Sequence, residues 1–220
     1  MNRILKYIPL AIAFMWQVSS AQDAKISSFY DLQAGNERFR QNISRNCDYS
    51  ALRQKFSAET TTPTVIVVCD ADSRVAPEII FDCTLGELYV IRTAGGILTA
   101  DALNAIEFAL DKYYSPLIVL LGNLQNEIIA SDLSDDPKSP ALKDIISKLT
   151  PSSSAISGKK FASDAEKIKF IVTENIKNQV IALDKLRAVK EHKIIKQLTI
   201  IPCIYDGTTG AVTEISEGDE

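Results

Sequence analysis

The sequence predicts an α/β fold in which helices flank a central, mostly parallel β-sheet. Apolar runs rich in β-branched residues, which are typical of buried strands, alternate along the chain with segments of helical periodicity. Strands separated by helices are expected to pair in parallel, with the helices on the faces of the sheet. Of the 220 residues, 46% are apolar and 24% are charged, which is typical of a globular protein with a sizeable core.

The first half of the chain repeats this alternation three times. Buried strands are predicted at residues 64–69, 88–92 and 116–121. Helices are predicted at residues 27–43, 77–83 and 100–113, where apolar side chains recur on one face. The second strand runs into Ala94-Gly95-Gly96, a sequence that favours a tight turn.

The second half of the chain is less regular. A helix is expected to begin near Asn126, and a polar excursion at residues 134–160 contains a short predicted helix at residues 141–149. One long helix is predicted at residues 163–189. A fourth strand at residues 198–205 is followed by a turn and a last short strand.

Residues 1–21 have the pattern of a secretory signal peptide. Arg3 and Lys6 precede an apolar run, and Ser19-Ser20-Ala21 offers small side chains for cleavage. The run is too short to span a bilayer comfortably, which favours a cleaved signal over a membrane anchor. The sequence therefore predicts secretion, to the periplasm if the source is bacterial, with a single domain at residues 22–220 and no membrane association after cleavage.

Charge and cysteine content exclude some functions. Without Arg3 and Lys6 the chain has 22 basic and 28 acidic residues, and the resulting net charge of about −6 argues against nucleic-acid binding. The cysteines are Cys47, Cys69, Cys83 and Cys203, and no CxxC pair is present, which excludes a zinc ribbon. Their disulfide pairing is left open.

Ligands of parallel α/β sheets bind outside the carboxyl ends of the strands. Three loops follow the first three predicted strands, at residues 70–74, 93–96 and 122–126. We expect the functional site where these loops meet.

Short motifs along nearly all of the chain after residue 21 resemble the β-class carbonic anhydrases. They are Gly35-Asn36-Glu37-Arg38-Phe39, Asp72-Ser73-Arg74-Val75, Pro77 to Asp82, Gly86 to Arg92, Ala94-Gly95, Glu107-Phe108-Ala109, Glu174-Asn175-Ile176 with Gln179-Val180, and Tyr205-Asp206 with Gly210. The resemblance implies the fold of that family and an obligate homodimer in which the N-terminal helix crosses its partner.

The family's zinc site consists of Cys-x-Asp-Ser-Arg after the first strand and His-x-x-Cys after the third, a donor set that suits tetrahedral zinc. On that frame Asp70, Asn123 and Asn126 stand at the three ligand positions, and Cys69 lies one residue too early. Neighbouring residues of a strand point to opposite faces, so Cys69 would need a bulge to reach the site.

The three replacements leave two interpretations of the pocket. Asp70, Asn123 and Asn126, with Asp72, offer oxygen donors to a hard cation such as magnesium or calcium. These oxygen donors are a weak ligand set for a cation. A hydrogen-bonded polar pocket without metal, bordered by Gly95 and Gly96, is therefore the favoured interpretation. The list of expected remnant-pocket residues is therefore Asp70, Asn123, Asn126, Gly95 and Gly96, with no metal ligand and no cofactor.

Asp72 and Arg74 match the family's Asp–Arg pair. In the family, the Asp accepts a hydrogen bond from the zinc-bound nucleophile and the Arg orients it. Without zinc, a structural ion pair that holds the loop is favoured over a catalytic role. His192, the only histidine, lies in a polar setting and is expected to be solvated at the surface.

Three functions follow from this reading. The first is an exported dimer that has lost zinc and CO2 hydration and that binds a small anion or an unidentified protein. The second is an enzyme, either an active carbonic anhydrase with an atypical metal site or a metal-free hydrolase. The third is a purely structural or inhibitory partner.

Overall fold

The computed structural model describes residues 26–216, apart from residues 27, 46–47, 59, 135 and 137. The predicted signal peptide and Cys47 lie outside the described residues. Within the described ranges, no helix is both long enough and apolar enough to cross a membrane.

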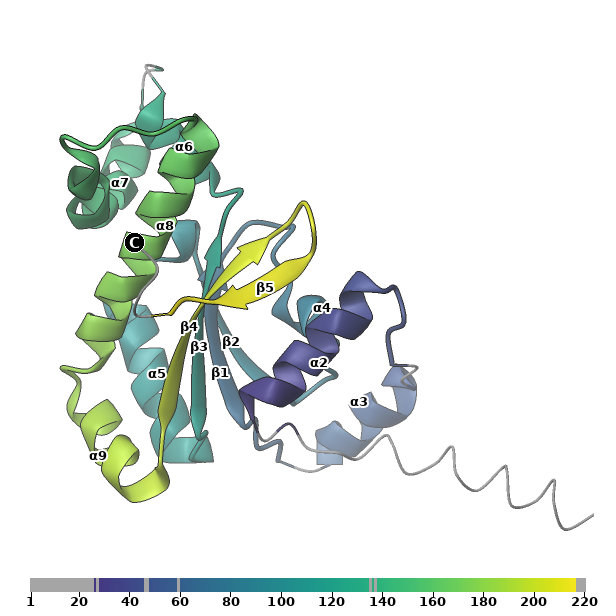
Figure 1. The fold of residues 1–220 in the computed structure, drawn as a ribbon. Helices are drawn as coiled ribbons and strands as arrows, with labels where there is room; N and C mark the ends of the chain where they lie inside the picture. The colour runs from purple at the N-terminus through teal and green to yellow at the C-terminus, as the bar shows by residue number, and fades with distance from the viewer. Residues whose placement is uncertain are drawn as a thin grey trace, which may run out of the picture.

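Five strands form one sheet, as the sequence predicts (Figure 1). They are β1 (Val65–Asp70), β2 (Leu88–Thr93), β3 (Leu117–Asn123), β4 (Thr199–Asp206) and β5 (Ala211–Glu214). The order is β2-β1-β3-β4-β5, with parallel pairing except for the antiparallel pair of β4 and β5. The predicted α/β fold with a mostly parallel sheet is therefore confirmed.

Helices cover both faces of the sheet (Figure 1). One face carries α5 (Ala100–Tyr113), α8 (Asp164–Leu183) and α9 (Arg187–Lys196), and the other carries α2 (Phe29–Arg40) and α4 (Pro77–Ile80). Alternate residues of β1 serve the two faces: Ile66 and Val68 pack with α5 and α8, whereas Val65, Val67 and Cys69 pack with α2 and the end of α4. The remaining described α-helices are α3 (Tyr49–Ala58), α6 (Glu127–Leu133) and α7 (Pro140–Ser153).

Helix α2 is bound tightly to its own chain. The side chain of Asn36 is buried; its Nδ2 donates to Ile80 O (3.1 Å) and Gly210 O (2.8 Å), and its Oδ1 accepts from Val212 N (3.0 Å). At Gly35, a Cβ would lie 1.9 Å from Phe81 O, so only glycine permits this approach. Packing and hydrogen bonding within the chain therefore account for Gly35 and Asn36 of the Gly35–Phe39 motif.

One helix prediction was wrong, and one helix was missed. The segment predicted as one helix at residues 163–189 is divided, because α8 ends at Leu183 and α9 begins at Arg187 after an extended Leu186. The break lets Ala188 and Val189 fold back against α5 and become buried. Helix α3 was not predicted, and it has no buried residue to produce an apolar stripe.

His192 is not solvated, contrary to expectation. It lies on α9 and is only 9% exposed. Its Nε2 is 3.5 Å from Asp111 Oδ1, and its ring packs beside that of Tyr114. The turn between α8 and α9 brings this otherwise polar stretch onto α5, which the local sequence does not reveal.

Candidate functional site

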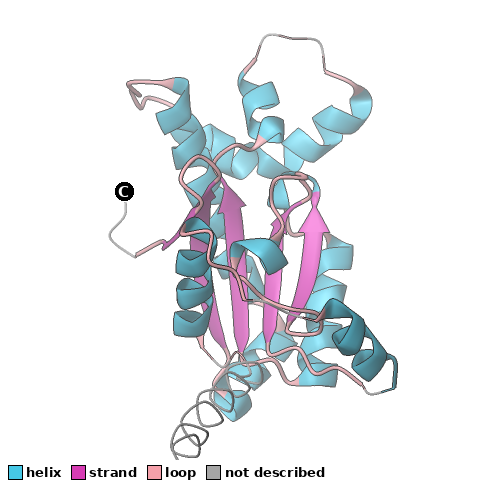
Figure 2. Cartoon of the chain, turned by 90° about the vertical axis from the view of Figure 1, so that its right-hand side faces the viewer, coloured by secondary structure: helices cyan, strands magenta, loops and turns pink. Residues whose placement is uncertain are grey.

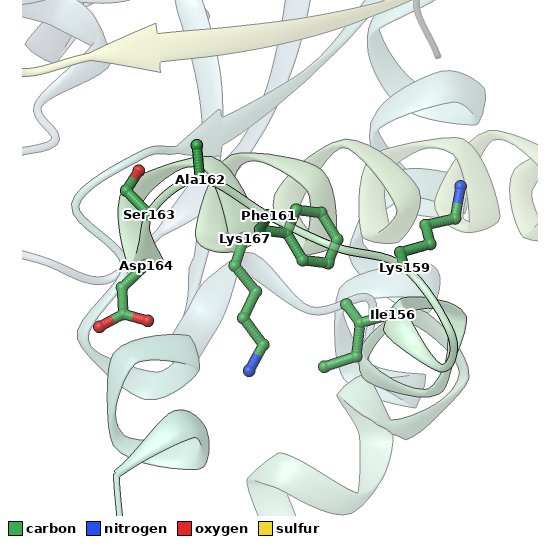
Figure 3. Close-up of a pocket in the computed structure, with 7 residues that line it drawn as sticks. All are labelled: Ile156, Lys159, Phe161, Ala162, Ser163, Asp164 and Lys167. Atoms are coloured by element: carbon green, nitrogen blue, oxygen red, sulfur yellow. The ribbon is translucent and has the colours of Figure 1, made fainter.

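A broad hollow of about 520 Å³ lies beside the start of α8, away from the predicted site (Figure 3). It is lined by Ile156, Lys159, Phe161, Ala162, Ser163, Asp164 and Lys167. Lys159 stands over the Phe170 ring at 4.5 Å, and the Ser163 side chain caps α8. Most of these side chains are exposed and none belongs to the strand ends, so the size of this hollow does not make it the better candidate.

The predicted site forms where the loops after β1, β2 and β3 meet, beyond the arrowheads of the parallel strands (Figure 2). Asp70 pairs with Thr93 of β2, and β3 extends past β1 on the other side to place Asn123 beside Asp70. Asn126 then begins α6. The structure therefore brings the three replaced ligand positions together.

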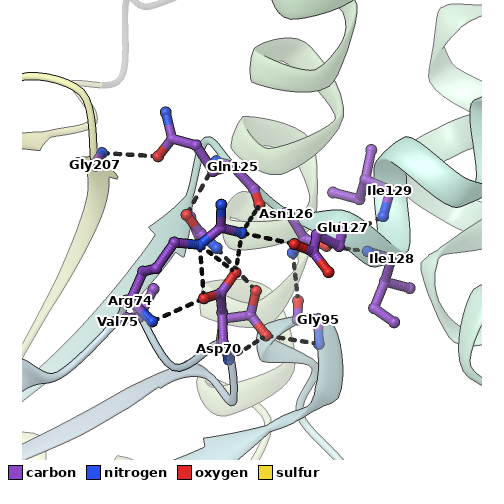
Figure 4. A network of polar contacts seen from close by, with 12 residues as sticks. Asp70, Arg74, Val75, Gly95, Gln125, Asn126, Glu127, Ile128, Ile129 and Gly207 are labelled. Atoms are coloured by element: carbon purple, nitrogen blue, oxygen red, sulfur yellow. Dashed lines mark hydrogen bonds and ion pairs between the residues drawn. The ribbon is translucent and has the colours of Figure 1, made fainter.

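Asp70 is the centre of this cluster (Figure 4). It is 5% exposed, and its Oδ1 accepts from the backbone of Gly95 (3.1 Å) and of Asp72 (3.3 Å). Its Oδ2 accepts from Asn123 Nδ2 at 3.0 Å. The one carboxylate thus ties together the ends of β1, β2 and β3.

The two asparagines also have their own partners. Asn123 Oδ1 accepts from Gln125 N at 3.0 Å. Asn126 Oδ1 caps α6 by accepting from Ile128 N and Ile129 N, and its Nδ2 donates to Gly95 O at 3.2 Å. Both side chains are buried, and their polar atoms are occupied by the protein itself.

Gly95 and Gly96 shape the loop after β2. Their φ angles of 70° and 65° lie in the left-handed region, which glycine adopts without strain. Gly95 N and O face Asp70 and Asn126, while Gly96 O accepts from Gln179 Nε2 of α8 at 2.8 Å. Gly95 borders the pocket directly, whereas Gly96 packs against the backbone of β1 behind it.

Cys69 points away from the site. The pairing of β1 with β2 is unbroken from Val65 to Asp70, so the strand contains no bulge. Cys69 is fully buried on the α2 face, and burial raises the pKa of its thiol to about 12. A buried, protonated thiol on the opposite face cannot replace a missing ligand.

Asp72 and Arg74 form an ion pair at the rim of the site (Figure 4). Arg74 Nε lies 2.9 Å and 3.2 Å from the two oxygens of Asp72, and Arg74 Nη2 also contacts that carboxylate. Hydrogen bonds from Arg74 lower the pKa of Asp72 to about 2. Arg92 Nη2, from β2, donates to the backbone oxygens of Asp72 and Val75, both at 2.8 Å, and so holds the loop after β1 in place.

The loops line a cavity of about 300 Å³ that is open to solvent. It is lined by Asp70, Ala71, Asp72, Ser73, Arg74, Ala94, Gly95, Glu127 and Ile128. Glu127 Oε1 lies 2.9 Å from Arg74 Nη2, so a salt bridge joins the β1 loop to α6 across this cavity.

The donor atoms at the site do not fit zinc. Asp70, Asn123 and Asn126 present a carboxylate and two amides, and each of these groups is hydrogen-bonded to the protein. Among the described residues, no group of three or more His, Cys, Asp or Glu side chains is arranged to hold a metal ion. Zinc in proteins prefers thiolate and imidazole ligands, which these positions lack.

Three contributors to the site were not predicted. Gln125 links it to the β4–β5 turn, because Gly207 N donates to its Oε1 at 2.7 Å and its Nε2 donates to Asp206 Oδ1 at 3.2 Å. Glu127 pairs with Arg74, and Gln179 holds the glycine loop. Because Gln125 and Glu127 flank Asn126 in the sequence, they could have been included in the predicted site. Their partners could not have been predicted, because those partners lie far away in the sequence.

Comparison with known proteins gives a consistent result. A family model described as carbonic anhydrase matches residues 64–212. A carbonic anhydrase of Mycolicibacterium smegmatis is 34% identical over 131 residues, and carbonic anhydrase 2 of Mycobacterium tuberculosis is 34% identical over the same length. These matches cover 58% of this chain; the chain spans 64% of the length of the first relative and 63% of the second.

Solved structures agree in fold. A tetrameric β-carbonic anhydrase from Sordaria macrospora aligns with a TM-score of 0.71 and 18% identity, covering 93% of this chain and 98% of that one. The β-carbonic anhydrase CafA of Aspergillus fumigatus aligns with a TM-score of 0.72 and 18% identity, covering 88% and 93%. With the family match over most of the sheet and the site loops, these findings show that the chain belongs to the carbonic anhydrase family, in its β class.

Proposed function

We propose that this chain is a β-carbonic-anhydrase-like protein that holds no zinc, does not hydrate CO2, and acts as a binding or interaction protein. The observation that carries the proposal is the state of the three ligand positions. Asp70, Asn123 and Asn126 are hydrogen-bonded to one another's loops, and none supplies the thiolate or imidazole that zinc prefers.

The remaining side chains are poor substitutes for a metal. Water needs a metal or a strong base to become a nucleophile at neutral pH. Asp72 is a weak base, because its pairing with Arg74 lowers its pKa to about 2. Asp70 already accepts three hydrogen bonds, and the described residues contain no Ser–His or Cys–His pair at the site.

The competing function is an active carbonic anhydrase with an atypical metal site, and the names of the similar mycobacterial proteins favour it. A hard cation would have to use Asp70, Asn123 and Asn126 as ligands. It would first have to break the hydrogen bonds that those side chains make, which weighs against this function.

Elemental analysis and a hydration assay test the proposal together. Purified protein, with any tag removed, is expected to contain far less than one zinc per chain, and stopped-flow hydration of CO2 is expected to stay near the uncatalysed rate. The single variants Asp70→Cys, Asn123→His and Asn126→Cys are expected to leave both results unchanged, because one soft ligand does not hold zinc against solvent. Stoichiometric zinc with a chelator-sensitive hydration rate in the unmodified protein would overturn the proposal.

Export and self-association complete the proposed function. The basic start and Ser19-Ser20-Ala21 support cleavage before Gln22 and delivery to the periplasm of a bacterium. N-terminal sequencing of the native protein tests this, since an intact Met1 in the cytoplasm would contradict it. The Sordaria relative is described as tetrameric, which supports at least a homodimer for this chain.

A further inference from the structure

We propose that Glu127 determines the charge preference of the 300 Å³ cavity: by engaging the guanidinium of Arg74, it excludes small anions such as bicarbonate. The inference rests on the proposed function in one respect, because it treats the cavity as a binding site without zinc. Of the two occupants that the sequence left open, a small anion and a protein partner, it removes the first.

Two of the three guanidinium nitrogens of Arg74, Nε and Nη2, already donate to neighbouring groups (Figure 4). Nε donates to both oxygens of Asp72. Nη2 contacts Asp72 and also donates to Glu127 Oε1 at 2.9 Å and to Gln125 O at 3.3 Å. An anion that sought a two-pronged contact with this guanidinium would have to displace a carboxylate that is already there.

The walls of the cavity also repel an anion. Its ionisable lining consists of three carboxylates, those of Asp70, Asp72 and Glu127, and one cation, Arg74. In their ionised forms these groups carry a formal charge of −2 in total. An entering anion therefore meets like charges on several sides.

Glu127 is the member of this set that can be removed without disturbing the loops. Asp70 and Asp72 are hydrogen-bonded into the chain turns, and their side chains are largely buried. The Glu127 side chain is 79% exposed and reaches Arg74 from the first position of α6. Its loss would free one side of the guanidinium and lower the negative charge of the rim, while the Asp72–Arg74 pair stays in place.

Titration with sodium bicarbonate, at constant pH and ionic strength, tests the inference. NMR spectroscopy would follow the Arg74 Nε–H signal and the backbone amides of Gly95 and Ile128, which line the cavity. The wild-type protein is expected to show no saturable change. Glu127→Gln is expected to bind bicarbonate at least tenfold more tightly than the wild type, and the double variant Glu127→Gln/Arg74→Gln is expected to lose that binding.

Glu191→Gln is the matched control. Glu191 also forms an exposed ion pair with an arginine at 2.9 Å, that of Arg187 on α9, and it lies outside the cavity. This variant removes the same charge and is expected to behave like the wild type.

Equal bicarbonate affinity in the wild type and Glu127→Gln, or no saturable binding in either, would overturn the inference. So would binding by Glu127→Gln that persists without Arg74. Zinc analysis of the same samples keeps the two proposals separate: an anion result of this kind on zinc-free protein refutes the role of Glu127 alone, whereas stoichiometric zinc refutes the proposed function.

Discussion

At the scale of single residues, Asp70 does most to hold the site together. It is buried, and it accepts hydrogen bonds from Gly95 N, Asp72 N and Asn123 Nδ2. These donors lie at the carboxyl ends of three different strands: in the loops after β1 and β2 and at the last residue of β3. A side chain that stands at a family ligand position has therefore become the acceptor at which these loops meet.

Asp70→Ala is expected to lower the free energy of unfolding by about 2–4 kcal/mol, because buried donors lose their acceptor. Urea unfolding measures the change. Asp144→Ala is the control, because Asp144 forms an exposed pair with Lys148, and a change below about 0.5 kcal/mol is expected there. If the two variants lost equal amounts of unfolding free energy, Asp70 would contribute no more to stability than an exposed ion pair does.

The lowered pKa of Asp72 predicts that the stability of the fold decreases at low pH. Its pKa in the folded protein, about 2, lies below its ordinary value of 3.8, so its ionised form favours folding. This contribution is complete above about pH 4 and is lost as the pH falls towards 2. Carboxyl NMR titration should show Asp72 ionising near pH 2 in the wild type and nearer 3.8 in Arg74→Gln.

The control for this titration is Lys148→Gln, which removes a distant basic partner and should leave the Asp72 midpoint unchanged. If Asp72 ionised near 3.8 in the wild type and in Arg74→Gln alike, the pairing of Arg74 with Asp72 would not govern its charge.

At the scale of elements, the position of α2 depends on the close contact at Gly35. The backbone of the helix approaches Phe81 O so closely that a methyl group has no room. Asn36 and the ion pair of Arg38 with Asp82, at 2.6 Å, fix the same helix to α4 and β5. Close packing and hydrogen bonding therefore fix the position of α2 against α4 and β5.

Gly35→Ala is expected to destabilise the protein by about 1–3 kcal/mol, because the added methyl group forces α2 away from Phe81. Thermal unfolding measures the loss. Gln33→Ala, at an exposed site of the same helix, is the control and should be nearly neutral. A Gly35→Ala protein as stable as the control would disprove this packing.

The sequence predicted the elements best where apolar periodicity decides them. Residues 100–113 match α5 in full, and the buried strands were found to within a residue or two. The convergence of the loops after β1, β2 and β3 was predicted because the carboxyl ends of parallel strands lie at one edge of the sheet. Periodicity could not reveal the break at Leu186, nor the burial of His192, since both depend on how α9 folds back on α5.

The pairing of Arg74 with Glu127 shows a second limit. The two residues are 53 positions apart and belong to an irregular loop and a short helix. No periodicity connects them, and only the convergence of β1 and β3 brings them within 2.9 Å. The residues at the ligand positions could be read from the motifs, but the contacts that now satisfy them needed the fold.

At the scale of the whole molecule, the proposed homodimer can be measured directly. The chain leaves large apolar side chains exposed, including Phe108, Ile194 and Ile195, which a second copy could cover. Light scattering of the mature protein at micromolar concentration is expected to give at least twice the mass of one chain. A single-chain mass under these conditions would contradict the dimer.

The cluster around Asp70 also bears on how the protein matures. Where a bound metal ties loops together, the final folding step waits for that metal and depends on its supply. Here the atoms that join the ends of β1, β2 and β3 all belong to the chain. If the protein holds no zinc, as proposed, a newly made molecule is expected to complete these loops as soon as its sheet forms, whether transition metals are scarce or abundant.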